Sequence, residues 1–381
     1  MPVSALLTLL LLLSAAPVEA ALSLWIGDDK GAAGVQAVAD RYQAETGQRV
    51  EVTAHANLPQ AFDQALATGE GPDIVIWAHD RLGEWASRGG LQPVYPSAEF
   101  RRFTAPFVWP ALTLDGELYG YPIAVEAVGL IYNRKLLPHP PLDFEHLFAL
   151  HPQLRAEGVK TIAWDYTNPY FSWGLLSSGD SFSLRATDDG FATGIDSADA
   201  KRGARLLQRL LVDGVMAAEL NGSRAAEAFK RGELAMTING PWSWQAFRNA
   251  GIDMGVVPLP RVQGQRSRVF VGVWAAAITR FAGDQHTAAD FIENYLLSLE
   301  GLRRINAEVS LGPVANRQLM KELAADPAVD QAFIAAVSGE LMPNRGPVSA
   351  FWRALQQALV RMTREAEAPG AALEQAAARI R

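Results

Sequence analysis

The order of predicted elements over residues 22–77 restricts the fold of this chain more than any other feature. Apolar strands alternate with helices that have one apolar face, and each helix ends at a glycine. In chain order these are strand 22–26, helix 34–45 with Gly47, strand 50–52, a helix around 62–66 with Gly69, and strand 74–77. This order predicts a parallel sheet with right-handed crossovers, and therefore an α/β fold.

The third predicted strand, Ile74–Trp77, ends in side chains that suit a polar ligand. Four apolar residues after Gly-Pro-Asp indicate a strand buried on both faces. Ligands in open α/β sheets lie beyond the carboxyl ends of the strands, where Trp77, Asp80 and Arg81 leave this strand. An aromatic ring, an acceptor and a fork of donors suit a neutral ligand with many hydroxyls. A surface ion pair at a strand end explains the same residues equally well.

The length of the chain, 381 residues including the predicted signal peptide, indicates about two domains. No Pro/Gly/Ser-rich linker separates them, so we expect short crossings of the chain between them. Residues 123–132 are apolar except for Glu126. Further strands are predicted over 161–164, 234–238 and 270–278, and two late helix faces are predicted from Phe291, Tyr295, Leu299 and Leu302 and from Phe351, Leu355 and Leu359.

Residues 1–20 are typical of a secretory signal peptide, with cleavage expected after Ala20. Their apolar core, Ala5–Leu13, is too short to span a bilayer. The alternative is a buried or anchoring helix. The sequence therefore predicts a secreted protein.

Composition excludes several classes of function. The chain has no Cys, which excludes disulfides, zinc–thiolate sites and thiol catalysis. Its net charge of −7, without a dense stripe of Lys and Arg, argues against nucleic acid as a partner. The six His have no metal-binding spacing, and neither a phosphate-binding loop nor a G-x-S-x-G motif occurs, so no metal and no cofactor are expected. Asp80 and Glu126 leave one enzymatic alternative, a glycosidase with paired carboxylates.

Aromatic residues lie beside polar ones at the ends of several predicted elements. For any single Trp a core role is the better interpretation, but five such clusters are less easily explained as core. The clusters are Trp25 before 28–30, Trp77 before 80–81, and residues 169–173, 241–244 and 351–353.

An ordered set of short motifs completes the sequence pattern. The motifs are L-W-I-G-D-D-K-G at 24–31, A-T-G-E-G-P-D-I at 67–74, W-A-H-D-R at 77–81, Y-P-I-A-V-E-A at 121–127, L-I-Y-N at 130–133, P-Y-F-S-W at 169–173, A-M-T-I-N-G-P-W-S-W at 235–244, F-V-G-V at 270–273, M-P-N at 342–344 and S-A-F-W at 349–352. With these motifs the chain resembles the bacterial periplasmic maltose/maltodextrin-binding proteins, the soluble receptors of ABC importers.

The resemblance implies two α/β lobes around a ligand cleft. One lobe would comprise 21–124 and 276–321, and the other 129–270 and 328–381. The hinge would lie near 124–129, 272–276 and 322–328. The implied protein is a periplasmic monomer without catalytic activity that binds a maltose-type sugar and delivers it to an inner-membrane permease.

The resemblance also assigns the ligand-binding residues. The polar and aromatic sugar contacts would be Asp29, Lys30, Trp77, Asp80, Arg81 and Glu126, and the stacking and packing face would be Tyr170, Phe171, Trp242, Met342 and Trp352. The sequence departs from the family pattern at Gly27, Asn168, Gly222, Arg353 and Gln356. These departures leave chain length and anomer open, with trehalose as an alternative ligand. A scaffolding protein on an old binding fold is a third interpretation.

Overall fold

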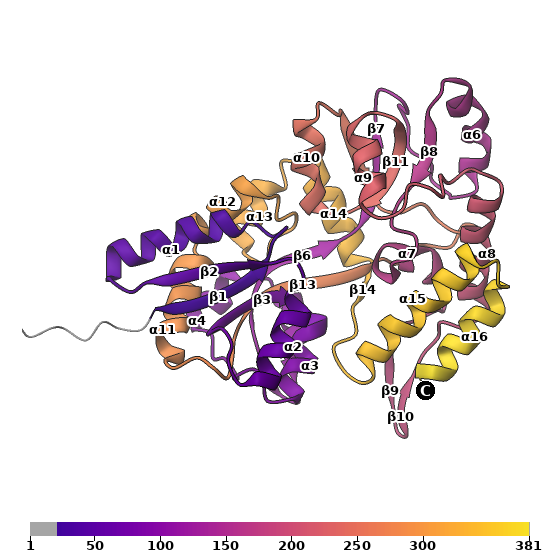
Figure 1. The fold of residues 1–381 in the computed structure, drawn as a ribbon. Coiled ribbons are helices and arrows are strands. Elements are labelled where there is room, and N and C mark those ends of the chain that lie inside the picture. The colour runs from indigo at the N-terminus through magenta and orange to yellow at the C-terminus, as the bar shows by residue number, and fades with distance from the viewer. Residues whose placement is uncertain (1–20, 381) are drawn as a thin grey trace, which may run out of the picture.

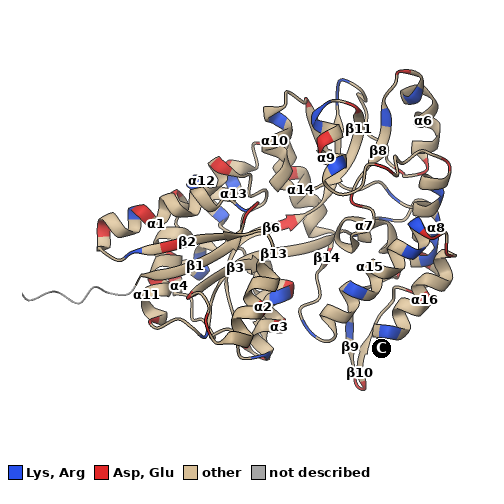
Figure 2. Ribbon diagram, viewed as in Figure 1, with Lys and Arg blue, Asp and Glu red and all other residues tan. Residues whose placement is uncertain are grey.

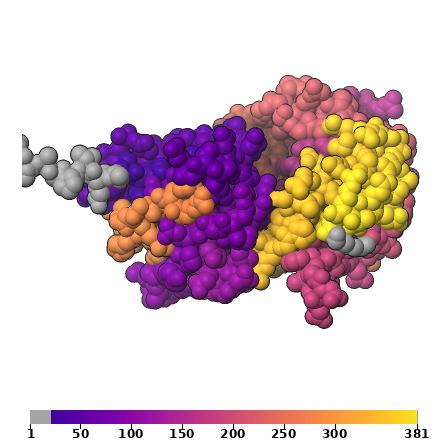
Figure 3. All heavy atoms as spheres, turned by 60° about the horizontal axis from the view of Figure 1, so that its bottom comes forward, coloured from indigo at the N-terminus to yellow at the C-terminus, as the bar shows by residue number. Residues whose placement is uncertain are grey.

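The computed structural model describes residues 21–380, so the predicted signal peptide lies outside the described residues. Two groups of helices surround two central sheets, which gives the two-lobed α/β architecture expected from the sequence (Figure 1). The chain passes between the lobes more than once. Orange residues around 300 lie beside the indigo and purple N-terminal residues, whereas the yellow C-terminal residues cover the other lobe (Figure 3).

The first lobe begins with the alternating elements predicted from the sequence. Strand β1 (Leu22–Gly27) pairs in parallel with β2 (Val50–His55) and with β3 (Ile74–Ala78). Helices α1 (Ala32–Thr46) and α2 (Leu58–Thr68) connect these strands. Both helices end at a glycine in the left-handed region, Gly47 and Gly69, as predicted.

This sheet is mixed rather than wholly parallel. Strand β13 (Phe270–Ile278) runs antiparallel to β3 on one side and to β6 (Tyr121–Ala127) on the other. The parallel prediction, made for the first three strands, is confirmed for β1–β3. Later segments of the chain add the antiparallel strands β6 and β13, which that local pattern did not predict. The remaining elements of this lobe are α3 (His79–Ser87), α4 (Ala98–Phe103), η1 (Pro106–Val108), α5 (Trp109–Leu112), β4 (Thr113–Leu114), β5 (Glu117–Leu118), α11 (Gln285–Asp290), η3 (Phe291–Leu296), α12 (Leu299–Glu308) and α13 (Arg317–Leu323).

The helix face predicted from Phe291 to Leu302 is divided between two elements. The π-helical segment η3 ends at Leu296, and α12 begins at Leu299. Ser298 separates them because its hydroxyl accepts a hydrogen bond from Gly301 N at 3.1 Å and caps α12. Hydrophobic periodicity alone predicted one continuous helix here, but the serine between apolar residues separates two.

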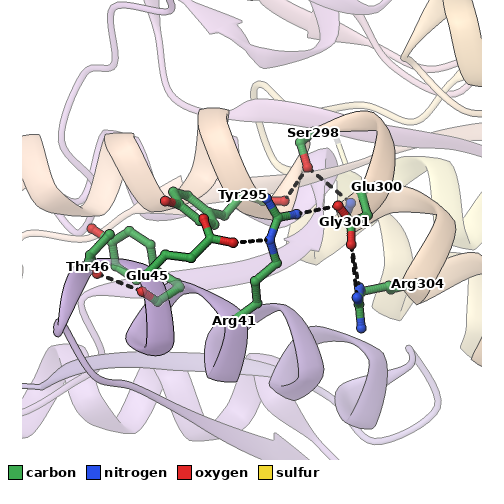
Figure 4. Close-up of polar contacts among 9 residues, drawn as sticks. Arg41, Glu45, Thr46, Tyr295, Ser298, Glu300, Gly301 and Arg304 are labelled. Atoms are coloured by element: carbon green, nitrogen blue, oxygen red, sulfur yellow. Dashed lines mark hydrogen bonds and ion pairs between the residues drawn. The ribbon is translucent and has the colours of Figure 1, made fainter.

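An ion-pair ladder on the surface joins α1 to α12 (Figure 4). Arg41 on α1 contacts Glu45 one turn later and Glu300 on α12, both at 2.8 Å. Glu300 also pairs with Arg304 at 2.9 Å. These side chains are 31–51% exposed, so the ladder adds little to stability. Buried apolar residues of both helices, among them Val38 and Ile305, belong to the same hydrophobic core.

The second lobe has its own sheet in the order β12-β7-β11-β8. Strand β7 (Gly129–Asn133) lies antiparallel to β11 (Leu234–Asn239) and to β12 (Met254–Val257), and β8 (Lys160–Ala163) lies parallel to β11. The other elements are α6 (His146–Ala156), α7 (Pro169–Leu176), β9 (Arg185–Thr187), β10 (Gly190–Ala192), α8 (Ala198–Val212), α9 (Ser223–Lys230), η2 (Pro241–Ser243), α10 (Trp244–Asn249), α14 (Pro327–Val337), α15 (Val348–Arg364) and α16 (Pro369–Ile380).

The two sheets are connected by very short crossings. Strand β6 belongs to the first sheet and β7 to the second, with only the buried Val128 between them. At the start of β13, Phe270 and Val271 pair with the short strand β14 (Glu340–Leu341). The apolar run that the sequence displays over 123–132 is therefore two strands in different sheets.

The surface agrees with the composition. Acidic and basic side chains are scattered over both lobes without a stripe of one sign (Figure 2). None of the helices within residues 21–380 is long and apolar enough to cross a membrane.

The contact between α7 and α8 gives a test of the packing. A Cβ on Gly203 of α8 would lie 1.9 Å from the carbonyl oxygen of Leu175, which is backbone and cannot move aside. We expect Gly203→Ala to lower the free energy of unfolding by about 1–3 kcal/mol in urea titrations, although Ala favours helices. Gly283→Ala is the matched control, because a Cβ there meets nothing within 4 Å. Equal stabilities of the two variants would contradict this packing.

Candidate functional site

A cavity of about 800 Å³ lies where the two lobes meet. All eleven residues that the resemblance assigned line it, from both sheets and from the crossings. Seven further residues complete the lining: Asn57, Pro59, Ala78, Asn168, Pro169, Trp274 and Gln356.

Lys30 connects the two lobes inside this cavity. It follows β1, and its ammonium lies 2.6 Å from a carboxylate oxygen of Glu126 near the end of β6. The same ammonium lies over the ring of Trp242 in the second lobe, 4.6 Å from the ring centre. Both charged side chains are about 15% exposed, so the pair is sheltered enough for its attraction to count.

Asp80 is a buried carboxylate in the first turn of α3. Burial raises its pKa to about 6, while the charge of Arg81 and the nearby indole N–H of Trp352 oppose the rise. The carboxylate is thus charged at neutral pH at a cost in stability. Such a cost is common at functional sites, where a group is kept for binding rather than for folding.

The preceding residue, His79, fixes the position of this helix start. Its Nδ1 accepts a hydrogen bond from Val273 N, and its Nε2 donates to the carbonyl of Met342, both at 2.9 Å. Burial lowers the pKa of His79 to about 4, so the ring is neutral and has one donor and one acceptor. The imidazole therefore ties α3 to β13 and to the segment after β14.

Arg81 makes a second link between the lobes. Its guanidinium donates to Glu84 at 2.8 Å and to the hydroxyl of Ser349 on α15 at 3.1 Å. Ser349 in turn donates to Glu84 at 2.7 Å. This small network sets the position of the Arg81 side chain at the wall of the cavity.

Aromatic side chains form the opposite wall. Tyr170 and Phe171 lie at the start of α7, and Trp242 lies in η2. The ring centres of Tyr170 and Phe171 are 6.2 and 6.3 Å from that of Trp242. The hydroxyl of Tyr170 donates to the carbonyl of Glu126 at 3.2 Å. Burial, with the charges of Glu126 and Asp80, raises the pKa of Tyr170 well above its usual range, so its hydroxyl stays protonated.

Trp352 and Met342 close the cavity from the C-terminal segment. The ring of Trp352 meets that of Phe270 edge-on at 5.1 Å. The methyl group of Met342 lies directly on Gly272 of β13, where a Cβ would come within 3.1 Å of it. A side chain at position 272 of β13 would therefore press on the end of Met342, which would have to shift by a few tenths of an ångström.

The departures from the family pattern have different outcomes. Asn168 lines the cavity but also caps α7, since its side chain accepts from Tyr170 N at 3.0 Å. Gln356 lines the cavity one turn after Trp352. Arg353 lies instead in a separate cavity of about 560 Å³ between α3, Phe191 and the start of α15. Gly222 lines neither cavity and precedes α9.

Trp274 is the main lining residue that the motifs missed. It lies in a fully buried strand, so its sequence context is typical of core. Alternation along β13 is the signal that could have found it, because Phe270, Gly272 and Trp274 share one strand face.

Within residues 21–380 no cluster of three or more acidic or His side chains is arranged to hold a metal ion.

Residues 37–331 match the family described as bacterial extracellular solute-binding protein. The chain belongs to this family. This solute-binding protein is 27% identical to the maltotriose-binding protein of Pyrococcus abyssi over 80% of its own length and 68% of that protein's. It is 25% identical to the galactooligosaccharide-binding protein of Bacillus subtilis, over 93% and 87% of the two chains. It is also 27% identical to a maltooligosaccharide ABC transporter solute-binding lipoprotein of Streptococcus pneumoniae, over 70% and 66%.

The raised pKa of Asp80 predicts how stability depends on pH. The folded protein holds this proton up to about pH 6, whereas the unfolded chain releases it near the usual value of 3.8. The contribution of Asp80 to stability is therefore present at low pH and lost as pH rises from about 4 to about 6.

We expect Asp80→Asn to remove this loss. The difference in unfolding free energy between the variant and the parent should grow by up to about 3 kcal/mol between pH 4 and pH 7, measured by urea titration. His79 is present in both proteins, so its own titration cancels in the difference. A difference that does not change with pH would show that the carboxylate is not strained by burial.

Proposed function

We propose that this solute-binding protein is the substrate-binding component of an ABC transporter and that it binds maltose and maltodextrins. The observation that supports this most is the composition of the cavity between the lobes. One wall consists of aromatic rings, and the other has fixed carboxylates, an ammonium and a guanidinium. A pyranose has apolar C–H faces and a rim of hydroxyls, so it suits both walls at once.

The energetic argument favours a neutral, hydroxyl-rich ligand. Hydrogen bonds between a charged group and a hydroxyl contribute roughly 1.5–3 kcal/mol each when buried. Asp80 and Glu126 are acceptors, and Lys30 and Arg81 are donors. A ligand that left these groups unpaired would be rejected. We expect micromolar affinity, about −8 kcal/mol.

Hinge closure would complete the site. The proposed lobes comprise 21–124 with 276–321 and 129–270 with 328–381, with hinges near 124–129, 272–276 and 322–328. The single residue between β6 and β7 supports a hinge there, because short segments at element ends absorb such rotations. The closed form would then bind an inner-membrane permease. The protein would be located in the periplasm, after removal of residues 1–20.

A second candidate is a receptor for galactooligosaccharides. The relative with that name aligns with 93% of this chain, more than the relatives named for maltose-type sugars. Identities of 25–27% leave the stereochemistry of the preferred sugar to experiment. Calorimetric titration with maltose, maltotriose, trehalose and galactobiose distinguishes these ligands. No heat with any α-glucoside would contradict the main proposal.

Trp242→Ala tests the aromatic wall. We expect maltose affinity to fall by about 1–3 kcal/mol, roughly 5- to 150-fold, because the stacking surface is lost. Trp25→Ala is the control. Trp25 also belongs to an aromatic cluster near a strand end, but its ring lies against His55 and does not line the cavity. Titration calorimetry of both variants measures the effect. Equal affinity of Trp242→Ala and the parent would contradict the binding face proposed here.

Product analysis separates a receptor from a glycosidase. Glu126 is already paired with Lys30, which favours a binding role over acid–base catalysis. We expect maltodextrin to be recovered intact after long incubation with the purified protein, as seen by chromatography. Shorter sugars that form with the parent protein but not with the Asp80→Asn variant would establish hydrolysis instead.

A further inference from the structure

Three side chains connect helix α3 to the start of helix α15. The guanidinium Nη1 of Arg81 donates to a carboxylate oxygen of Glu84 at 2.8 Å and to the hydroxyl of Ser349 at 3.1 Å. The same hydroxyl donates to that carboxylate oxygen at 2.7 Å. A hydroxyl can accept and donate at once, so Ser349 closes a ring of three hydrogen bonds.

The members of this ring come from two helices. Arg81 and Glu84 lie three residues apart on α3, so their ion pair is local to that helix. Both contacts of Ser349 reach instead from the first turn of α15 to α3. These two hydrogen bonds therefore exist only while the start of α15 lies against α3.

The surroundings of the ring allow a close but reversible contact. Gly83 of α3 lies directly on the segment that leads into α15, where a Cβ would overlap the carbonyl oxygen of Asn344. Arg81 lines the cavity between the lobes, whereas Glu84 and Ser349 line the separate cavity of about 560 Å³. The side chains of Arg81 and Glu84 are 27% and 28% exposed, so the ring can open without leaving a buried charge unpaired.

The same two helices carry opposite sides of the proposed sugar site. Asp80 and Arg81 lie on α3, and Trp352 lies on α15, and all three line the cavity between the lobes. Trp352 follows Ser349 by three residues, so both side chains lie on the same face of α15. A movement of this helix start away from α3 would therefore widen the gap between the Trp352 ring and the polar groups of α3.

We propose that Glu84 and Ser349 are positioning residues for sugar binding, because their hydrogen bond clamps α15 to α3 and sets this gap. The inference rests on the proposed function and deepens it, since neither residue lines the cavity between the lobes. The measured affinity falls with the fraction of molecules in the arrangement that is competent to bind. Loss of the clamp therefore weakens the binding of different sugars by the same factor.

Ser349→Ala removes both contacts that reach α3. We expect maltose and maltotriose to bind about 3- to 20-fold more weakly in titration calorimetry, a loss between those for exposed and for buried contacts of a charged group. Ser349→Thr keeps the hydroxyl and should bind within about twofold of the parent.

Ser87→Ala is the matched control and should bind like the parent. Ser87 also lines the separate cavity, but its hydroxyl donates within α3, to the carbonyl of Glu84 at 2.8 Å. Equal losses of affinity in Ser349→Ala and Ser87→Ala would contradict the clamp.

A double-mutant cycle tests whether Glu84 and Ser349 act as a pair. Glu84→Gln should also weaken binding about 3- to 20-fold, and combining it with Ser349→Ala should add little, because both changes remove the same hydrogen bond. Fluorine NMR of fluorotryptophan-labelled protein observes Trp352 directly, with its signal assigned by its absence from Trp352→Phe. This signal should shift in Ser349→Ala before sugar is added, but not in Ser87→Ala.

The outcomes separate the two proposals. A parent that binds maltose, with a Ser349→Ala variant of equal affinity, overturns this inference alone. Additive losses in the double variant also overturn it, because the two side chains then act independently. Losses that differ between maltose and maltotriose overturn it as well, since they indicate contact with the sugar. A parent that binds no α-glucoside overturns the proposed function, and this inference with it.

Discussion

The pairing of β13 with three other strands is the constraint on which the rest of the structure depends. Its nine residues are all buried, and it bonds to β6 on one side and to β3 and β14 on the other. No other described strand contacts elements from the start, the middle and the end of the chain in this way. One strand therefore positions the part of the cavity lined by Trp274, the sheet of the first lobe and the C-terminal segment that carries Met342.

Small residues occupy much of β13. The run Ala275–Ala277 puts only methyl groups on the two buried faces of the sheet, while a Cβ on Gly272 would lie 3.1 Å from the methyl group of Met342. Where larger groups occur, they have specific tasks: Trp274 reaches the cavity, and Val273 donates its amide to His79. Because His79 stays neutral through burial, it joins three segments without placing a charge in the core.

Much of this could be predicted from sequence, and the failures have physical causes. Alternation and glycine caps predicted β1–β3 correctly because those signals are local. Trp77, Asp80 and Arg81 were placed at a ligand site by the end of the predicted strand. The complete set of eleven cavity residues came from the family resemblance, since they lie in distant segments of the chain. The antiparallel pairing of β13 with β3 and β6 was not predicted, because the sequence near a strand does not show which distant strand it pairs with. The helix start at Ser298 was not predicted, because a single polar residue also occurs within continuous amphipathic helices.

The contact of Lys30 with Glu126 and Trp242 has a consequence for ligand entry. One face of the Trp242 indole is already covered by the Lys30 ammonium, and that cation is neutralised by the Glu126 carboxylate. Under the function proposed above, ligand binding would be an exchange, in which groups of the sugar replace contacts that the protein already makes with itself. A molecule too small to replace both the ring contact and the ion pair would gain little from this exchange, so the contacts of Lys30 would set a lower limit on ligand size.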